Sequence, residues 1–323
     1  MGASVRYFAQ RFLQLIVVFL IVTFVAMVAI QAASKDPARD LAGPLNSTEE
    51  RVEQIRKLYH LDRAYPIRYA YWLKNLVSLD LGISPTMGAK VRTIVAQRAP
   101  ITLLLGLYSI LLALLLSLPI AVYAAYRRDG PFDKAVSAIT FAAVSLPNII
   151  LAVLLGYFFS TKWRWFPYAA SKVWPWDDFT DHIRNIALPT VTLAVGLIAI
   201  FVRLLRADLV NTLQSDFIVM ARSKGISPAR ILWRHALRSS LFSLMTSVAL
   251  QFGGILGGAV VAEQIFALPG MGLLLFQAVQ QKDLLVVQAC AALFALTVVI
   301  INFVVDMLYA VVDPRIRHAR ALG

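Results

Sequence analysis

The chain has 323 residues, of which 59% are hydrophobic, and its formal net charge at pH 7 is +13. This apolar fraction is higher than in soluble globular proteins and predicts one all-α, polytopic membrane domain over residues 1–323. The cations are spread among loops between apolar runs, so membrane topology explains the charge better than nucleic-acid binding does. The single cysteine, Cys290, excludes an internal disulfide and a zinc site built from thiolates.

The first predicted span covers residues 12–33, which is longer than the apolar region of a signal peptide and sufficient to cross a bilayer. Residues 34–100 follow as a long polar connection that we expect to be extracytoplasmic. A capping box of Ser47 and Glu50 predicts one helix in it, and Pro66 predicts a second helix at the membrane interface. Loops of this length are uncommon unless they are functional, and an inert cap is the alternative.

The next three predicted spans cover residues 101–126, 135–160 and 188–205. Pro147 removes a backbone hydrogen bond from the third span, where we expect a kink. The loop after that span is rich in tryptophan, which is typical of the membrane–water interface. His182 is expected to be solvated rather than bound to a metal. Arg203 and Arg206, at the end of the fourth span, are expected to extend toward lipid headgroups.

The last two predicted spans cover residues 241–261 and 284–312. Glu263 ends the first of these, so we expect it at the outer interface, either as a helix-end carboxylate or near an outer gate. Asn148 and Gln251 are uncharged polar residues within spans; they are candidates for a transport pathway, with interhelical hydrogen bonding as the alternative. No carboxylate lies at the centre of a span, which disfavours an ion-coupled carrier.

Lysine and arginine are concentrated in the short loops on the side of the N-terminus. The positive-inside rule therefore predicts that both termini are cytoplasmic and that residues 208–238 form a cytoplasmic loop. Within this loop, Phe217, Met220 and Ala221 have i, i+3 and i+4 spacing and share one face of a short helix. Arg222 and Lys224 lie late in that helix, where its dipole favours cations.

Gly225 is expected to end this helix in a left-handed conformation, and Ser227 with Pro228 to begin a second one. An apolar face with a basic rim is typical of a docking element for a soluble partner, whereas a basic loop that only fixes topology is the alternative. The candidate docking residues are Asp216, Phe217, Met220, Ala221, Arg222, Lys224, Gly225, Ser227 and Arg230.

The sequence contains no P-loop for phosphates, no H-E-x-x-H motif and no G-x-S-x-G motif. We therefore expect no enzymatic activity, no cofactor and no metal site in this chain. If ATP drives the protein, the nucleotide must bind to another polypeptide.

The spacing of Ala221 and Gly225, followed by residues 234–238 (RHALR), resembles the signature loop of permeases in ATP-binding-cassette (ABC) importers. The similarity is to the dipeptide, oligopeptide and nickel permease family, of the first-permease type, and it extends over nearly the whole chain. Val219 and Arg238 depart from the wider importer pattern, in which glutamate and proline are common at these positions, but both departures resemble the peptide branch.

This resemblance implies a type I importer permease with six spans that works by alternating access in the bacterial inner membrane. It implies a second homologous permease subunit, two cytosolic subunits that bind ATP and Mg, an extracytoplasmic substrate-binding protein, and contact with membrane lipid but not nucleic acid. The expected substrates are peptides or related small solutes. The alternatives are a channel or ion-coupled carrier whose basic loop only sets topology, and a scaffold that transports nothing.

Overall fold

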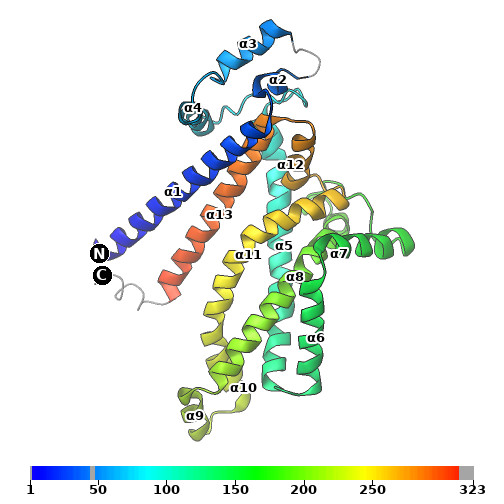
Figure 1. Ribbon diagram of the computed structural model, residues 1–323. Helices are drawn as coiled ribbons and strands as arrows, with labels where there is room; N and C mark the ends of the chain where they lie inside the picture. The colour runs from blue at the N-terminus through cyan, green and yellow to red at the C-terminus, as the bar shows by residue number, and fades with distance from the viewer. Residues whose placement is uncertain (1, 44–47, 313–323) are drawn as a thin grey trace. The chain divides into compact units, whose positions relative to one another are not determined.

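The computed structural model describes residues 2–43 and 48–312, and every regular element in these ranges is a helix (Figure 1). Within these residues, five helices are long and apolar enough to cross a membrane, and one bent helix pair supplies a sixth crossing if it counts as a single span. The all-α, multi-span prediction is therefore confirmed. The chain divides into two compact units, residues 1–101 with 270–323 and residues 102–269.

The first unit joins the two ends of the chain, because α1 packs along α13. Its helices are α1 (Gly2–Ala33), α2 (Pro37–Ala42), α3 (Glu49–Leu58), α4 (Tyr65–Val77), the beginning of α5 (Val91–Tyr126), α12 (Met271–Gln280) and α13 (Leu284–Val312). Cys290 is completely buried among side chains of α5, α12 and α13.

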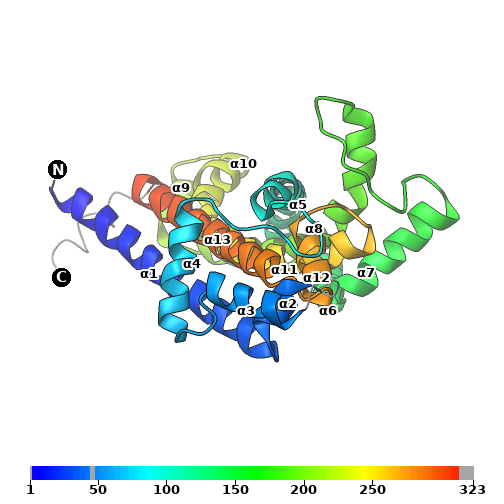
Figure 2. The ribbon, with the colours of Figure 1, turned by 90° about the horizontal axis from the view of Figure 1, so that it is seen from above.

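Short helices pack on the N-terminal end of α13 in this unit. Ala38 of α2 and Val52 and Ile55 of α3 form an apolar cluster with Leu284. Figure 2 shows α4 beside α1, and the hydroxyl of Tyr69 on α4 donates to the Leu20 carbonyl at 2.9 Å.

Two helix boundaries in this unit differ from those expected. Thr48 is the N-cap of α3 and makes no side-chain capping bond, whereas the Ser47 of the predicted capping box lies outside the described residues. Helix α5 begins at Val91, so it already includes the end of the predicted outer connection. Pro100 does not interrupt this helix, because the apolar contacts of Val91 and Ile94 with α12 and α13 hold its first turns in place.

The second unit holds the rest of α5, α6 (Pro131–Ser145), α7 (Asn148–Leu155), the π-helix η1 (Gly156–Lys162), α8 (Phe179–Leu213), α9 (Asp216–Ser223), α10 (Pro228–Arg230), the π-helix η2 (Ile231–Ala236) and α11 (Leu237–Ile265). Helix α8 is central, since it packs against α6, α7 and α11. Helices α10, η2 and α11 run on without a break from Pro228 to Ile265, a length of 38 residues.

The third predicted span is broken rather than kinked. Helix α6 and the α7–η1 segment meet at an angle of 100°. Leu146 between them is extended, with φ −81° and ψ 119°, because a residue before proline is excluded from the helical region. Pro147 then serves as the N-cap of α7. The prediction of a kink located the position correctly and underestimated the change of direction.

His182 lies in the first turns of α8 and is only 4% exposed. Its Nδ1 is 2.6 Å from the Val173 carbonyl oxygen and its Nε2 is 3.3 Å from the Tyr108 hydroxyl. The expectation of a solvated histidine is therefore wrong, because the long helix extends beyond the predicted span and draws this ring into the unit. Among the described residues, no group of three or more histidine, cysteine or carboxylate side chains has the arrangement of a metal site.

Candidate docking joint and transport cavity

The candidate docking residues lie on a helix–turn–helix joint between α8 and α11. Helix α9 ends at Ser223, and Gly225, which follows the C-cap residue Lys224, has a φ of +73° in the left-handed region. The amide of Ile226 donates to the Ala221 carbonyl at 3.2 Å, and that of Gly225 donates to the Arg222 carbonyl at 2.9 Å. These two bonds form a Schellman motif. A Cβ added at Gly225 would meet no atom within 4 Å, so backbone conformation alone favours glycine there.

The apolar residues of α9 divide between two faces. Ile218 and Ala221 are buried against Ile231, with Ile226 packed on the same cluster. Phe217 and Met220 are exposed instead, Met220 by 57%. The prediction that Ala221 shares an exposed apolar face is therefore wrong. Ala221 is 9% exposed because the Schellman turn folds Ile226 back over it.

The polar rim predicted for the joint is exposed to solvent. Asp216 lies in the first turn of α9, where the helix dipole favours an anion. Arg222, Lys224 and Arg230 are exposed around the turn. Ser227 precedes α10 as its N-cap, but its side chain makes no capping bond, and the Ser227 carbonyl accepts from Ile231 at 3.0 Å.

A cavity of about 240 Å³ lies where α6, α7, α8 and α11 meet, and both Asn148 and Gln251 line it. Neither side-chain amide makes a hydrogen bond to another described residue, so interhelical bonding does not account for them. Gly258 permits the close approach of helices beside the cavity. A Cβ at this position would come within 3.0 Å of Leu193 Cδ2 and 3.4 Å of Asn148 Nδ2.

Glu263, the third candidate pathway residue, does not line this cavity. Its side chain is completely buried, and its Oε1 accepts a 2.5 Å hydrogen bond from Thr102 Oγ1 on α5. Glu263 lies two residues before the end of α11, as expected for a helix-end carboxylate, but its side chain is buried in the second unit.

Sequence reasoning missed an ion pair between α6 and α8. Arg206 donates from Nε and Nη2 to the two carboxylate oxygens of Asp133, whose side chain is only 3% exposed. The backbone amide of Asp129 also donates to Asp133 at 2.9 Å. Arg206 is thus bound by a carboxylate of its own unit, and the guanidinium carbon of Arg203 lies 4.2 Å from the ring centre of Phe141. The sequence shows only that Asp133 precedes the predicted third span and Arg206 follows the fourth, which does not identify them as partners.

Residues 117–318 match the family described as the inner membrane component of binding-protein-dependent transport systems, and residues 4–106 match the N-terminal region of such membrane components. The chain belongs to this family. It is a multi-pass permease subunit of a binding-protein-dependent ABC importer, which places it in a complex with ATPase and binding-protein partners.

Several curated relatives of this permease cover almost its whole length. A putative peptide transport system permease of Brucella abortus is 37% identical over 96% of this chain and 98% of its own. An oligopeptide transport system permease of Bacillus subtilis is 34% identical over 97% of this chain and 99% of its own. Among solved structures, an inward-facing MetNI methionine ABC transporter has the same fold, with a TM-score of 0.57 and 20% identity over 68% of this permease and 96% of that chain.

Proposed function

We propose that this permease imports peptides or closely related small solutes by alternating access in a bacterial inner membrane. The named peptide permeases that resemble it over nearly their full length support this substrate class. A second homologous permease subunit and an extracytoplasmic substrate-binding protein complete the transport path. The excess of cations in the loops on the N-terminal side supports a topology with both termini in the cytoplasm.

The observation that carries the mechanism is the exposed apolar surface of α9. Phe217 and Met220 remain exposed while the neighbouring Ile218 and Ala221 are buried, so the joint is folded before any partner covers it. Two cytosolic subunits that bind ATP and Mg dock through this surface, with Arg222, Lys224 and Arg230 at its rim. Closure of these subunits moves the joint, and the continuous helix from Pro228 to Ile265 carries the movement into the membrane.

Within the membrane, the cavity lined by Asn148 and Gln251 forms part of the pathway. Its polar groups are uncharged amides, which can exchange hydrogen bonds with a passing solute without retaining an ion. Glu263 contributes a buried hydrogen bond to Thr102 near the end of α11 and acts as a gate residue by fixing the position of that helix against α5.

Replacing both Phe217 and Met220 by alanine tests the docking role. We expect co-purification of the ATPase subunits and ATP-driven peptide uptake to fall by about tenfold or more, because exposed apolar side chains that anchor an interface contribute about 2 kcal/mol or more each. The matched control is Leu115→Ala on α5, which removes a similarly exposed apolar side chain far from α9 in the sequence. Normal co-purification with the double variant would exclude α9 as the docking element.

A further inference from the structure

A second cavity, of about 350 Å³, lies within the first unit and shares no residue with the cavity lined by Asn148. It is bounded by α1, the turn after α3, α4, residues 80–82 and the first turns of α13. Its volume is at the small end of the range for ligand pockets, which corresponds to an amino acid or a very short peptide.

Gln288 and Tyr59 are among the polar side chains of this cavity that make no hydrogen bond to a described residue. Gln288 of α13 lines the cavity and is only 7% exposed, yet its carboxamide makes no hydrogen bond within the described part of the chain. The hydroxyl of Tyr59 likewise has no hydrogen-bond partner among the described residues. Burial, and then the charge of Asp80, raise the pKa of Tyr59, so the hydroxyl remains a donor at neutral pH. A buried polar group without a partner, such as the Gln288 carboxamide, is costly unless a ligand or water satisfies it, and the half-buried Tyr59 hydroxyl is available to the same ligand.

The remaining wall is apolar and aromatic. Met27, Leu285 and Trp72 line the cavity, together with Tyr71. The ring of Tyr71 stacks on His60 with 3.7 Å between ring centres, which fixes its orientation. Such a wall is suited to an apolar or aromatic side chain of a ligand.

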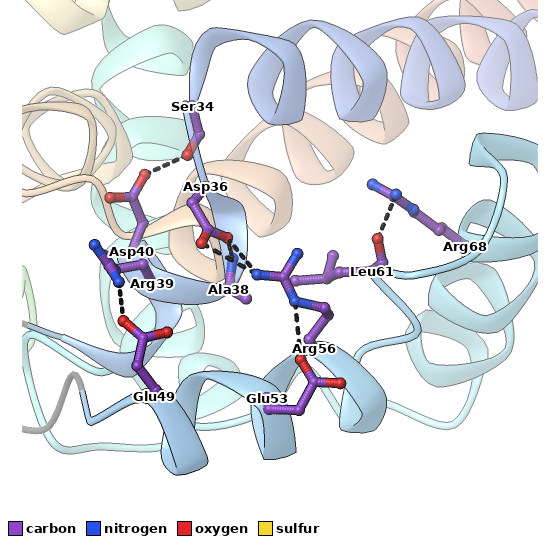
Figure 3. Close-up of polar contacts among 10 residues, drawn as sticks. All are labelled: Ser34, Asp36, Ala38, Arg39, Asp40, Glu49, Glu53, Arg56, Leu61 and Arg68. Carbon is purple, nitrogen blue, oxygen red and sulfur yellow. Dashed lines mark hydrogen bonds and ion pairs between the residues drawn. The ribbon is translucent and has the colours of Figure 1, made fainter.

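Charges of opposite sign flank this wall. Arg68 donates from Nη1 to Gln31 at 3.1 Å, from Nη2 to the Leu61 carbonyl and from Nε to the Arg63 carbonyl, as Figure 3 shows for Leu61. A guanidinium has five N–H donors, so two remain for an anion. Asp80 supplies the negative charge, and among the described residues its carboxylate accepts one long bond, of 3.4 Å, from the Gly82 amide.

The walls are held in place independently of any ligand. Asp283 is completely buried and accepts from Ser84 Oγ at 2.5 Å and Thr86 Oγ1 at 2.8 Å, which fixes the segment after Asp80 onto the start of α13. Arg56 of α3 pairs with Glu53 of the same helix and with Asp36, the N-cap residue of α2, and so ties α2 to α3 (Figure 3). A preformed site of this kind binds a ligand without an ordering cost.

We propose that this cavity is a binding site for a zwitterionic amino acid or short peptide with an apolar side chain. Asp80 binds the ammonium group, Arg68 binds the carboxylate, and the Gln288 carboxamide and Tyr59 hydroxyl bind backbone groups of the ligand. The side chain of the ligand packs on Trp72 and Tyr71. The charge and shape of the cavity carry this inference, so it goes beyond the transport pathway and does not depend on the proposed coupling through α9.

The test is calorimetric titration of the full-length permease in phosphatidylcholine nanodiscs. The probes are the dipeptide phenylalanyl-alanine and its form blocked by N-acetylation and C-amidation. We expect the free dipeptide to bind at least about tenfold more tightly than the blocked form, since each lost charge-assisted bond is worth about 1.5–3 kcal/mol. Equal binding of both forms, or no binding of either, would overturn the proposal, whatever the uptake assays show.

Three variants locate the binding. Gln288→Leu keeps the volume and removes the amide, so the affinity should fall by about fivefold to tenfold, while Gln281→Leu, an exposed glutamine of the same unit, should leave it unchanged. Tyr59→Phe removes only the hydroxyl and should weaken binding without lowering the melting temperature. Asp80→Asn should abolish the preference for a free over an acetylated N-terminus. Unchanged affinity in Gln288→Leu, or a phospholipid retained by the wild type and lost by this variant in native mass spectrometry, would contradict a peptide site.

Discussion

The two ends of helix α6 differ in how their polar groups are satisfied. At its start, the Asp133 carboxylate accepts two bonds from Arg206 and one from the Asp129 amide, so α6 is fixed to α8. At its end, the chain turns by 100° beside a cavity whose two amides, Asn148 and Gln251, bind nothing in the described chain. Helix α6 is therefore fixed by charged groups at its start and adjoins unfilled, polar-lined space at its end.

The largest expected effect is a loss of stability when the ion pair at the start of α6 is broken. Asp133→Asn leaves Arg206 with its charge partly buried and unpaired, which should lower the free energy of unfolding by about 3–5 kcal/mol. Chemical denaturation in detergent measures this change. The control is Asp129→Asn, whose exposed carboxylate forms only a surface pair with Arg128, and its effect should stay below about 1 kcal/mol. Equal losses of unfolding free energy in the two variants would contradict the view that the Asp133–Arg206 pair fixes the start of α6.

A larger residue in place of Gly258 would fill part of the cavity at the end of α6. Gly258→Ala places a methyl group against Leu193 and Asn148, which should cost about 1–3 kcal/mol by overpacking and reduce peptide uptake. The neighbouring Gly257 has nothing within 4 Å of an added Cβ, so Gly257→Ala should leave uptake and stability close to those of the wild type. Uptake that is equally reduced in both variants would show that the cavity is not the reason.

A smaller effect is expected at the turn of the docking joint. Gly225→Ala should destabilise the end of α9 by about 1–2 kcal/mol, because an alanine at φ +73° is strained although there is space for its methyl group. Gly225→Asn should be milder, since asparagine tolerates this conformation better. Hydrogen exchange of the α9 amides measures the change, and an alanine variant no worse than asparagine would argue against backbone strain.

The smallest expected effect is a difference in stability between variants of two N-cap residues in the second unit, one at α8 and one at α10. The carboxylate of Asp178 accepts from the Asp181 amide at 2.9 Å at the start of α8, so Asp178→Ala should cost about 1 kcal/mol. Ser227 makes no such bond, and Ser227→Ala should therefore cost less than about 0.5 kcal/mol. Thermal unfolding of the two variants measures the difference, and a larger loss for Ser227→Ala would contradict the observed cap geometry.

Much of the fold follows from features that are local in sequence. Apolar runs locate the membrane helices, and Gly225, Ser227 and Pro228 locate the turn of the joint, because backbone conformation depends on neighbouring residues. Helices α5 and α8 begin earlier than expected. Tertiary contacts of Val91 and His182 stabilise the polar first turns of these helices. Their hydropathy alone assigns those segments to loops.

Contacts between residues far apart in the sequence could not be predicted, because they depend on the tertiary fold. The partners Asp133 and Arg206 are 73 residues apart, and Ser84 and Asp283 are 199 apart. Nothing local indicates which of several aspartates meets which donor. The docking joint was predictable as a surface, but the division of its apolar residues between buried Ala221 and exposed Met220 required knowledge of where Ile226 and Ile231 fold back.

The unbroken run from Pro228 to Ile265 has a geometrical consequence. Thirty-eight residues at about 1.5 Å each form a rod of about 57 Å, nearly twice the roughly 30 Å of bilayer hydrocarbon. A rotation of about 10° around the midpoint of such a rod sweeps each tip sideways by about 5 Å. Under the proposed docking mechanism, a modest swing applied at the Pro228 tip would therefore displace the Ile265 tip by a similar distance.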